Sequence, residues 1–274
     1  MIEWFFSVPW ALWLLEAFSS MVNAVCFRRW SRRQDEAWAA GLETEHQQAV
    51  ALVVAIKGFD PEQTPPFFDA ICGQEYRSYR LLLTMESPDD PVAPWIRERF
   101  GLEADETSWK SGNDAGLREV RLIYAGPCEG RGQKVHNQIA AFEQLEETDA
   151  IVAFADADMH CGRDWLARLV APINTGTNPV STTYRYFVPR QATFINLLAT
   201  AINASVATLG GRDRWNSLWG GSMAIGRPDF EALDVPSLFS GSLNDDLRLG
   251  RASRKSGRKP AFVRSLLVPS PVDF

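Results

Sequence analysis

The sequence predicts an α/β protein with an open, mostly parallel sheet and helices on both faces. Four apolar, β-branched runs alternate with helix-like segments, an order typical of βαβ units. The runs are "AVALVVAI" (49–56), "YRLLLTM" (79–85), "EVRLIYA" (119–125) and "AIVAFA" (150–155). Strands that are apolar without alternation are typical of a sheet covered on both faces.

Helix-like segments lie between these runs, namely "PPFFDAICGQ", "PVAPWIRERF" and "KVHNQIAAFEQL". The second half of the chain is less regular. It predicts a strand at 178–187, an amphipathic helix at 191–211 ended by Gly210 and Gly211, and a short strand at 219–225. A helix at 245–257 has acids at its start and stops at Gly257, and a last strand follows at 261–268.

The N-terminus is more apolar than the rest of the chain. Residues 4–27, "WFFSVPWALWLLEAFSSMVNAVCF", contain one charge, Glu16, and as a helix they would be about 36 Å long, enough for a hydrocarbon core of about 30 Å. Four arginines follow at once, which predicts an uncleaved membrane anchor with the rest of the chain on the cytoplasmic side. A helix lying in the membrane interface and a buried helix of a soluble protein are the alternatives.

The predicted organisation is therefore an anchor at 1–30, a polar linker at 31–48 and one folded domain at 49–274. The net charge of −6 and the pI near 5.2 argue against a nucleic-acid partner, which needs a concentrated basic surface. The four cysteines have neither zinc-site nor disulfide-framework spacing.

Acidic residues follow several of the predicted strands. "KGFD" with Lys57 follows the first, "ESPDD" with Asp90 follows the second, and "DAD" follows the fourth. Ligands of open parallel sheets bind beyond the carboxyl ends of the strands. We therefore expect the residues that bind ligands to lie at this edge of the sheet.

Asp156 and Asp158 are the central pair of this edge. Alternate residues of an extended chain point to the same side, so the two carboxylates would form an oxygen site for Mg²⁺ or Mn²⁺, which would carry a nucleotide diphosphate. The alternative is a turn with Asx hydrogen bonds and no metal.

Three further groups have both a structural and a functional interpretation. Asp90 is either a helix cap or an acceptor for a nucleobase or ribose, and Asp245 and Asp246 are either first-turn acids or a general base. "GPCEGRGQK" is not a phosphate-binding loop of the G-x-x-x-x-G-K-[ST] type, although Lys134 could still neutralise a diphosphate.

Taken in order, the segments "KGFDP", "ESPDDP", "GQKVHNQ", "DAD", "WGGSM" and "NDDLRLGRASRKSG" resemble the ceramide glucosyltransferase branch of the lipid-directed glycosyltransferases related to glycosyltransferase family 2. The resemblance covers about residues 50 to 270 and the anchor. It implies a GT-A fold, a UDP-sugar donor, a divalent metal and inversion at the anomeric carbon. UDP-glucose and a ceramide-like membrane lipid are the implied substrates, with hopanoid or diacylglycerol as other acceptors.

The resemblance also implies roles for single residues. Asp90 is similar to the first family acid, which contacts the nucleotide; Asp156 and Asp158 match the second, metal-binding motif; Asp246 matches the third acid, the base. The remaining residues implied to bind the nucleotide sugar are Lys57, Lys134, Trp219, Gly220, Gly221, Ser222 and Asp245.

One departure concerns the family's (Q/R)xxRW motif, since no tryptophan follows Asp246. This predicts either a fragment that lacks further membrane helices or a short form. It also keeps open a catalytically inactive subunit that binds nucleotide sugars. A nucleotidyltransferase is disfavoured because "KGFDPEQTPP" is not a glycine-rich, basic loop.

Overall fold

The computed structural model describes residues 2–113, 116–208 and 216–274. Its strands are β1 (Val50–Ala55), β2 (Ser78–Met85), β3 (Ser108–Lys110), β4 (Gly116–Tyr124), β5 (Ile151–Asp156), β6 (Val180–Thr182), β7 (Arg185–Pro189), β8 (Ser222–Gly226), β9 (Ala261–Phe262) and β10 (Val268–Val272). Its α-helices are α1 (Ile2–Trp38), α2 (Thr64–Cys72), α3 (Val92–Phe100), α4 (Gln133–Phe142), α5 (Trp165–Asn174), α6 (Phe194–Thr208), α7 (Arg227–Ala232), α8 (Val235–Phe239) and α9 (Asp245–Lys255). Short 3₁₀ helices are η1 (Ala39–Leu42), η2 (Thr44–His46) and η4 (Arg264–Leu266).

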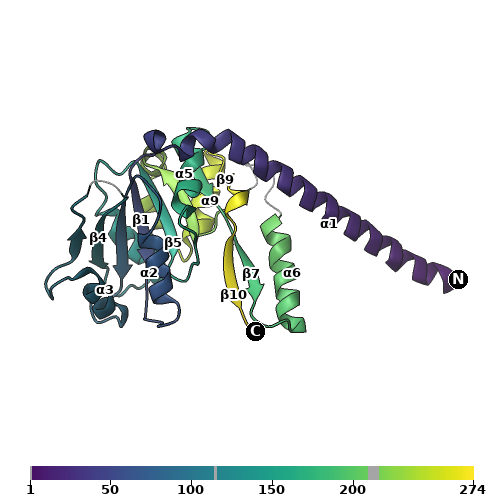
Figure 1. The fold of residues 1–274 in the computed structure, drawn as a ribbon, viewed down its shortest axis with the longest axis horizontal. Coiled ribbons are helices and arrows are strands. Elements are labelled where there is room, and N and C mark those ends of the chain that lie inside the picture. Colours follow the sequence, from purple (N-terminus) through teal and green to yellow (C-terminus); the bar gives the residue numbers. More distant parts are fainter. Residues whose placement is uncertain (1, 114–115, 209–215) are drawn as a thin grey trace.

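The described strands form an eight-stranded sheet in the order β3-β4-β2-β1-β5-β8-β6-β9 (Figure 1). Its central strands β4, β2, β1 and β5 are all parallel, and β8 runs antiparallel between β5 and β6. The predicted mostly parallel α/β sheet is thus confirmed. Because these central strands are parallel, their carboxyl ends lie at one edge.

Helices cover both faces of the sheet, and each face has its own apolar core. Leu52 and Leu81 point into the core beneath α2, α3 and α5, which includes the buried Trp165. Their neighbours Val53 and Leu82 point into the second core, beneath α4, α7, α8 and α9. This two-sided burial explains why these strands lack polar alternation.

Two strand predictions in the second half were wrong in their extent. The segment 178–187 is not one strand, since β6 ends at Thr182 and β7 starts at Arg185 and pairs with β10 in a separate two-stranded sheet. The segment 261–268 is interrupted by η4, where Arg264 is buried. The helix predicted at 191–211 is present as α6, while Gly210 and Gly211 lie outside the described residues.

The apolar N-terminal segment is helical. It lies within α1, which continues without a break through residues 31–38 of the predicted linker and projects away from the sheet (Figure 1). None of the helices in the described ranges has both the length and the apolar character needed to cross a bilayer. A spanning role for residues 4–27, and the domain boundaries at 30 and 48, stay predictions.

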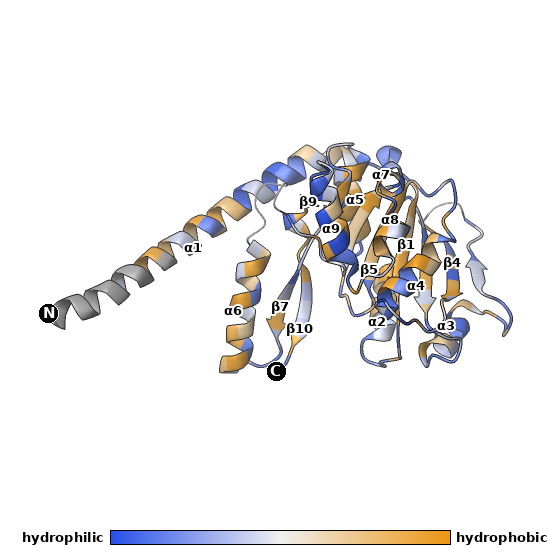
Figure 2. Cartoon of the chain, turned by 180° about the vertical axis from the view of Figure 1, so that it is seen from behind, coloured by the Kyte–Doolittle hydropathy of each residue, from blue (hydrophilic) through white to orange (hydrophobic). Residues whose placement is uncertain are grey.

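The β7–β10 pair and α6 form a small layer beside the main sheet. This layer lies on the side of the molecule from which α1 projects, and α6 contacts α1 (Figure 1). In Figure 2 most of α6 has the colour of apolar residues, although it lies on the outside of the molecule.

Candidate active site

A cleft of about 480 Å³ lies at the carboxyl ends of β1 and β5. Its walls come from the loop after β1, from the start of α2 and from the end of β5. Lys57, Asp156 and Asp158 all line it. The structure therefore brings together one predicted cation and both predicted metal ligands.

Lys134 links the cleft to α9. Its Nζ lies 2.7 Å from Asp156 Oδ1 and 3.1 Å from Asp245 Oδ2. Burial lowers the pKa of Lys134, but the charges of Asp156 and Asp245 outweigh this effect, so that the net pKa is raised. The lysine is therefore a fixed positive charge between two carboxylates at neutral pH.

The pKa of Asp156 is raised from its ordinary value. Burial is the main cause, the ion pair with Lys134 opposes it, and the charges of Asp158 and Asp245 add to it. Asp156 and Asp245 thus share one lysine, and the charge of Asp158 acts on Asp156 without such a partner in the described part of the chain. A further cation at this point would relieve the repulsion between the carboxylates.

The predicted geometry of the D-x-D triplet was wrong in one respect. β5 ends at Asp156, and Ala157 and Asp158 form a turn, so the pair is not on one side of an extended chain. The turn nevertheless leaves Asp158 exposed on the cleft wall beside Asp156. Two carboxylates on an open cleft fit Mg²⁺ or Mn²⁺, which takes few protein carboxylates and completes its shell with phosphate and water oxygens.

Asp90 shapes the loop that closes the cleft. Its Oδ1 accepts hydrogen bonds from the backbone N–H groups of Gly58 (2.9 Å) and Val92 (3.0 Å), so it joins the loop after β1 to the first residue of α3. The neighbouring Asp89 stays exposed in a turn with Ser87. The N-cap position of α3 is Pro91 and not Asp90, although Asp90 binds the first N–H group of the helix. Contact of Asp90 with a nucleotide stays a prediction.

The "WGGS" segment approaches the acids closely enough to require glycine. A Cβ added at Gly220 would lie 2.7 Å from Asp245 Oδ1, and one added at Gly221 would lie 2.7 Å from Asp156 Oδ2. Ser222 is fully buried and accepts a hydrogen bond from Trp165 Nε1 (2.9 Å), so its side chain holds the segment against α5.

Asp246, the predicted base, stands at the first turn of α9. Its Oδ2 accepts a hydrogen bond from the Gly220 N–H (3.2 Å), and the residue is half-exposed, whereas Asp245 is buried. The two adjacent acids thus differ in environment. Asp245 holds Lys134, and Asp246 borders the glycine segment.

Gln138 is a residue of this site that sequence reasoning missed. Its Nε2 donates a 2.7 Å hydrogen bond to Asp245 Oδ2, the oxygen that also faces Lys134. Lys134 and Gln138 are four residues apart on α4 and therefore share one helix face. That spacing is the signal that could have identified Gln138.

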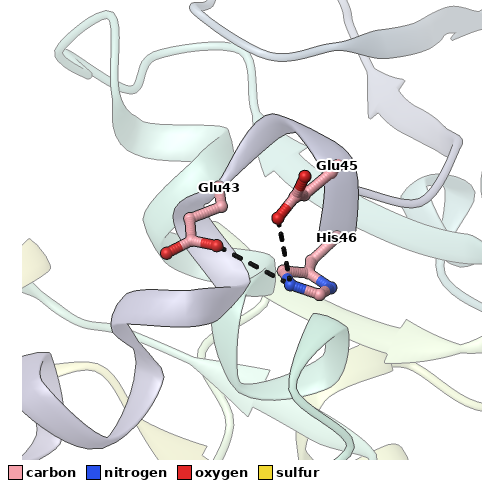
Figure 3. A group of neighbouring side chains, drawn as sticks. All are labelled: Glu43, Glu45 and His46. Carbon is pink, nitrogen blue, oxygen red and sulfur yellow. Dashed lines mark ion pairs between the residues drawn. The ribbon is translucent and has the colours of Figure 1, made fainter.

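A second acidic group lies elsewhere, in η2 and the residue before it (Figure 3). His46 Nε2 is 3.7 Å from both Glu43 Oε2 and Glu45 Oε1, and all three side chains are exposed. Among the described residues it is the one group of three whose ligand atoms lie close enough for a metal. This group precedes β1, at the opposite edge of the sheet from Asp156. Exposed ion pairs are sufficient to explain why its three side chains lie close together.

The fold and its acidic edge define a GT-A-like glycosyltransferase. The sequence profile of Glycosyl transferase family 21 matches residues 8–270. The chain belongs to this family. No curated protein sequence matches it.

Solved structures share the fold at low sequence identity. Mannosyltransferase PcManGT from Pyrobaculum calidifontis, in complex with GDP-Man and Mn²⁺, is 15% identical with a TM-score of 0.54, over 92% of this chain and 68% of that one. TarS from S. aureus is 11% identical with a TM-score of 0.51, over 82% and 60%. GalNAc-T7 with UDP, GalNAc and Mn²⁺ is 13% identical with a TM-score of 0.50, over 84% of this chain and 44% of that one.

Proposed function

We propose that the protein is an inverting, metal-dependent glycosyltransferase that moves glucose from UDP-glucose to the hydroxyl of a ceramide-like membrane lipid. The observation that carries this proposal is the meeting of Asp156, Asp245 and Lys134 at the sheet edge, with Asp246 one residue further. Family membership and structural neighbours solved with GDP-Man and Mn²⁺, or with UDP, GalNAc and Mn²⁺, support it.

Asp156 and Asp158 would hold Mg²⁺ or Mn²⁺. The bound ion supplies positive charge to the diphosphate of the donor. Lys134 adds a protein cation at the same place, since its Nζ is 2.7 Å from Asp156 Oδ1. Lys57 lines the same cleft and Asp90 is hydrogen-bonded to the loop after β1, and both observations support a role for these residues in donor binding.

Asp246 removes the proton from the acceptor hydroxyl. The acceptor oxygen attacks the anomeric carbon as the bond from that carbon to the diphosphate oxygen breaks, which inverts the configuration. Gly220 and Gly221 allow the sugar to approach both acids, because a side chain at either position would occupy that space. Trp219 adds an aromatic surface at the rim, where its ring packs against Tyr184.

Membrane association on the cytoplasmic side, through α1, completes the proposal. Apolar residues of α1 such as Leu14 and Phe18 are exposed, and exposed arginines follow them. A domain attached in this way would meet its lipid acceptor at the bilayer surface.

Isothermal calorimetry with Mn²⁺ tests the donor class. We expect UDP-glucose to bind more tightly than ATP, and Asp156→Asn to weaken that binding. A preference for nucleoside triphosphates would contradict a glycosyltransferase. Donor binding without any transfer or hydrolysis would instead favour a catalytically inactive subunit that binds nucleotide sugars.

A further inference from the structure

Helix α6 turns its two asparagines inward and its large apolar residues outward. Asn196 and Asn203 are buried, while Phe194 is 80% exposed. The exposed apolar side chains, which we call the apolar face of α6, are Phe194, Ile195, Leu197, Leu198, Ile202 and Val206. This arrangement is the reverse of a helix that packs on a core and faces water.

Hydrogen bonds fix this orientation. The Asn203 Oδ1 accepts a hydrogen bond from the backbone N–H of Phe187 on β7 (2.9 Å). The Asn196 Nδ2 donates to Gln191 O and to Asp273 Oδ1, both at 2.9 Å. Turning the apolar face inward would break all three of these hydrogen bonds.

The apolar face is large and uncharged, and the exposed Ser205 lies within it. At 100° per residue its six side chains span about half of the helix circumference. No residue from Phe194 to Thr208 carries a charge. The helix is about 22 Å long, shorter than a hydrocarbon core of about 30 Å, so it suits a position along a membrane surface and not across it.

The neighbouring helix α1 indicates what kind of surface the apolar face of α6 would contact. It contacts α6 and exposes apolar side chains of its own, including Leu15, Phe18 and Val22. Exposed arginines follow these directly, at Arg28, Arg29, Arg32 and Arg33. Apolar residues beside guanidinium groups match the acyl and phosphate layers of an anionic bilayer.

The same layer is joined to the candidate active site. Asn203 of α6 holds Phe187 on β7, and the first residue of β7, Arg185, places its guanidinium 5.9 Å from the ring centroid of Trp219. Tyr184, directly before β7, packs edge-on against Trp219 with ring centroids 5.8 Å apart. A lipid entering beside α6 would therefore meet the segment that carries Gly220 and Gly221.

We propose that the apolar face of α6 inserts into the cytoplasmic leaflet of an anionic membrane, with the α1 arginines at the phosphate groups, and that acceptor lipids enter there. The proposal deepens the proposed function and rests on it only for the acceptor. The membrane contact itself requires neither donor nor turnover.

Photo-crosslinking of the full chain tests the contact. p-Benzoylphenylalanine is placed at Phe194, at Leu198, or at the control Leu42, an exposed apolar residue of η1. After irradiation with phosphatidylcholine vesicles that contain phosphatidylglycerol, we expect lipid adducts at positions 194 and 198 and none at 42. Chain-to-chain crosslinks at 194 without lipid adducts would overturn the proposal in favour of a second copy, and no adduct at all would also overturn it.

Vesicle flotation supplies a second test. The double variant Leu198→Gln and Ile202→Gln should partition at least about tenfold more weakly than wild type, since it removes two large apolar contacts. Leu42→Gln should bind as wild type does. Equal flotation of the double variant would overturn the proposal.

The two proposals fail separately. Lipid adducts on a chain that transfers no sugar would contradict the proposed function and leave the membrane contact intact. Sugar transfer to a lipid by a chain that gives no adduct at 194 or 198 would contradict the membrane contact alone.

Discussion

Lys134 and Asp156 form an ion pair of 2.7 Å between Nζ and Oδ1, across 22 residues of sequence. Asp156 is the last residue of β5, and Lys134 lies in the first turn of α4. The same amine reaches Asp245 at the start of α9. One lysine thus fixes the relative position of a strand end and two helices around the cleft.

Replacing Lys134 should weaken donor binding. Lys134→Met removes a cation that would face the donor diphosphate, and charge-assisted hydrogen bonds contribute about 1.5–3 kcal/mol. We expect the Kd for UDP-glucose with Mn²⁺ to rise by roughly 10- to 100-fold by calorimetry. Lys110→Met on the exposed edge strand β3 is the matched control, and equal Kd values for the two variants would exclude Lys134 from the donor site.

Adding one methyl group at Gly221 should impair turnover. The new Cβ would lie 2.7 Å from Asp156 Oδ2 and would overlap the Trp219 ring, so these groups must shift. Displacements of about 1 Å at an active site cost about 100-fold, and we expect a loss of this size in kcat/KM. At Gly112 an added Cβ meets nothing within 4 Å, so Gly112→Ala should keep wild-type kinetics. Wild-type kinetics for Gly221→Ala would show that the close approach has no role in catalysis.

Replacing Asp90 should affect stability and donor binding, whereas replacing the adjacent Asp89 should affect neither. Asp90→Ala removes the acceptor for the N–H groups of Gly58 and Val92, which should lower the free energy of unfolding by about 1–2 kcal/mol and raise the Kd for the donor. Asp89→Ala changes an exposed turn and should alter neither quantity by more than about 0.5 kcal/mol. Denaturant unfolding and calorimetry measure the two quantities. Equal effects of both substitutions would contradict the claim that the hydrogen bonds of Asp90 stabilise the fold and the donor site.

Arg80 forms a buried ion network beneath the sheet that should govern stability and not catalysis. Its guanidinium is bonded to Glu119 (2.7 Å) and Asp149 (2.6 Å), with all three side chains buried. Asp149→Asn leaves the buried guanidinium under-compensated, so we expect a loss of about 3–5 kcal/mol in the free energy of unfolding. A loss below about 1 kcal/mol in denaturant titrations would contradict this role.

The same ion network predicts that the free energy of unfolding depends on pH. Burial raises the pKa of Glu119, but the hydrogen bond and charge of Arg80, together with Arg121, outweigh it and hold the pKa below its ordinary value. The folded state therefore binds this proton less readily than the unfolded chain. The stabilisation is complete above the unfolded pKa of about 4.5 and is lost as the pH falls through the folded value. Unfolding titrations of wild type and Glu119→Gln should converge at acidic pH, and parallel curves would contradict the linkage.

The central sheet was predictable from the sequence because its strands are buried on both faces. β1 and β5 are continuous apolar runs, whereas β2 contains Arg80 and β4 contains Arg118, Glu119 and Arg121. All four strands lie within a few residues of the predicted bounds. Since parallel strands end at one edge, the acids after β1 and β5 were also expected to meet, and they do. Periodicity and topology were sufficient for this part.

The remaining elements and site contacts could not be predicted, because they depend on residues that are far apart in the sequence or on segments too short to show a pattern. β6 and β9 have three and two residues, too few for a periodic pattern. The bond between Gln138 and Asp245 joins residues 107 positions apart, and the turn at Asp158 follows the strand without a glycine or proline signal. For α6 the amphipathic pattern was visible, but the buried asparagines reverse the side that would be expected to face the core.

Transfer of radiolabelled glucose from UDP-glucose to ceramide, with Mn²⁺ and membranes that contain the expressed chain, is the most direct measurement. Labelled lipid should form with wild type and fall by about 100-fold or more with Asp246→Asn, because the base that accepts the hydroxyl proton is lost. Donor binding should persist in that variant. Failure of wild type to label any lipid from any common UDP-sugar, or equal labelling by Asp246→Asn, would contradict lipid glycosylation with Asp246 as the base.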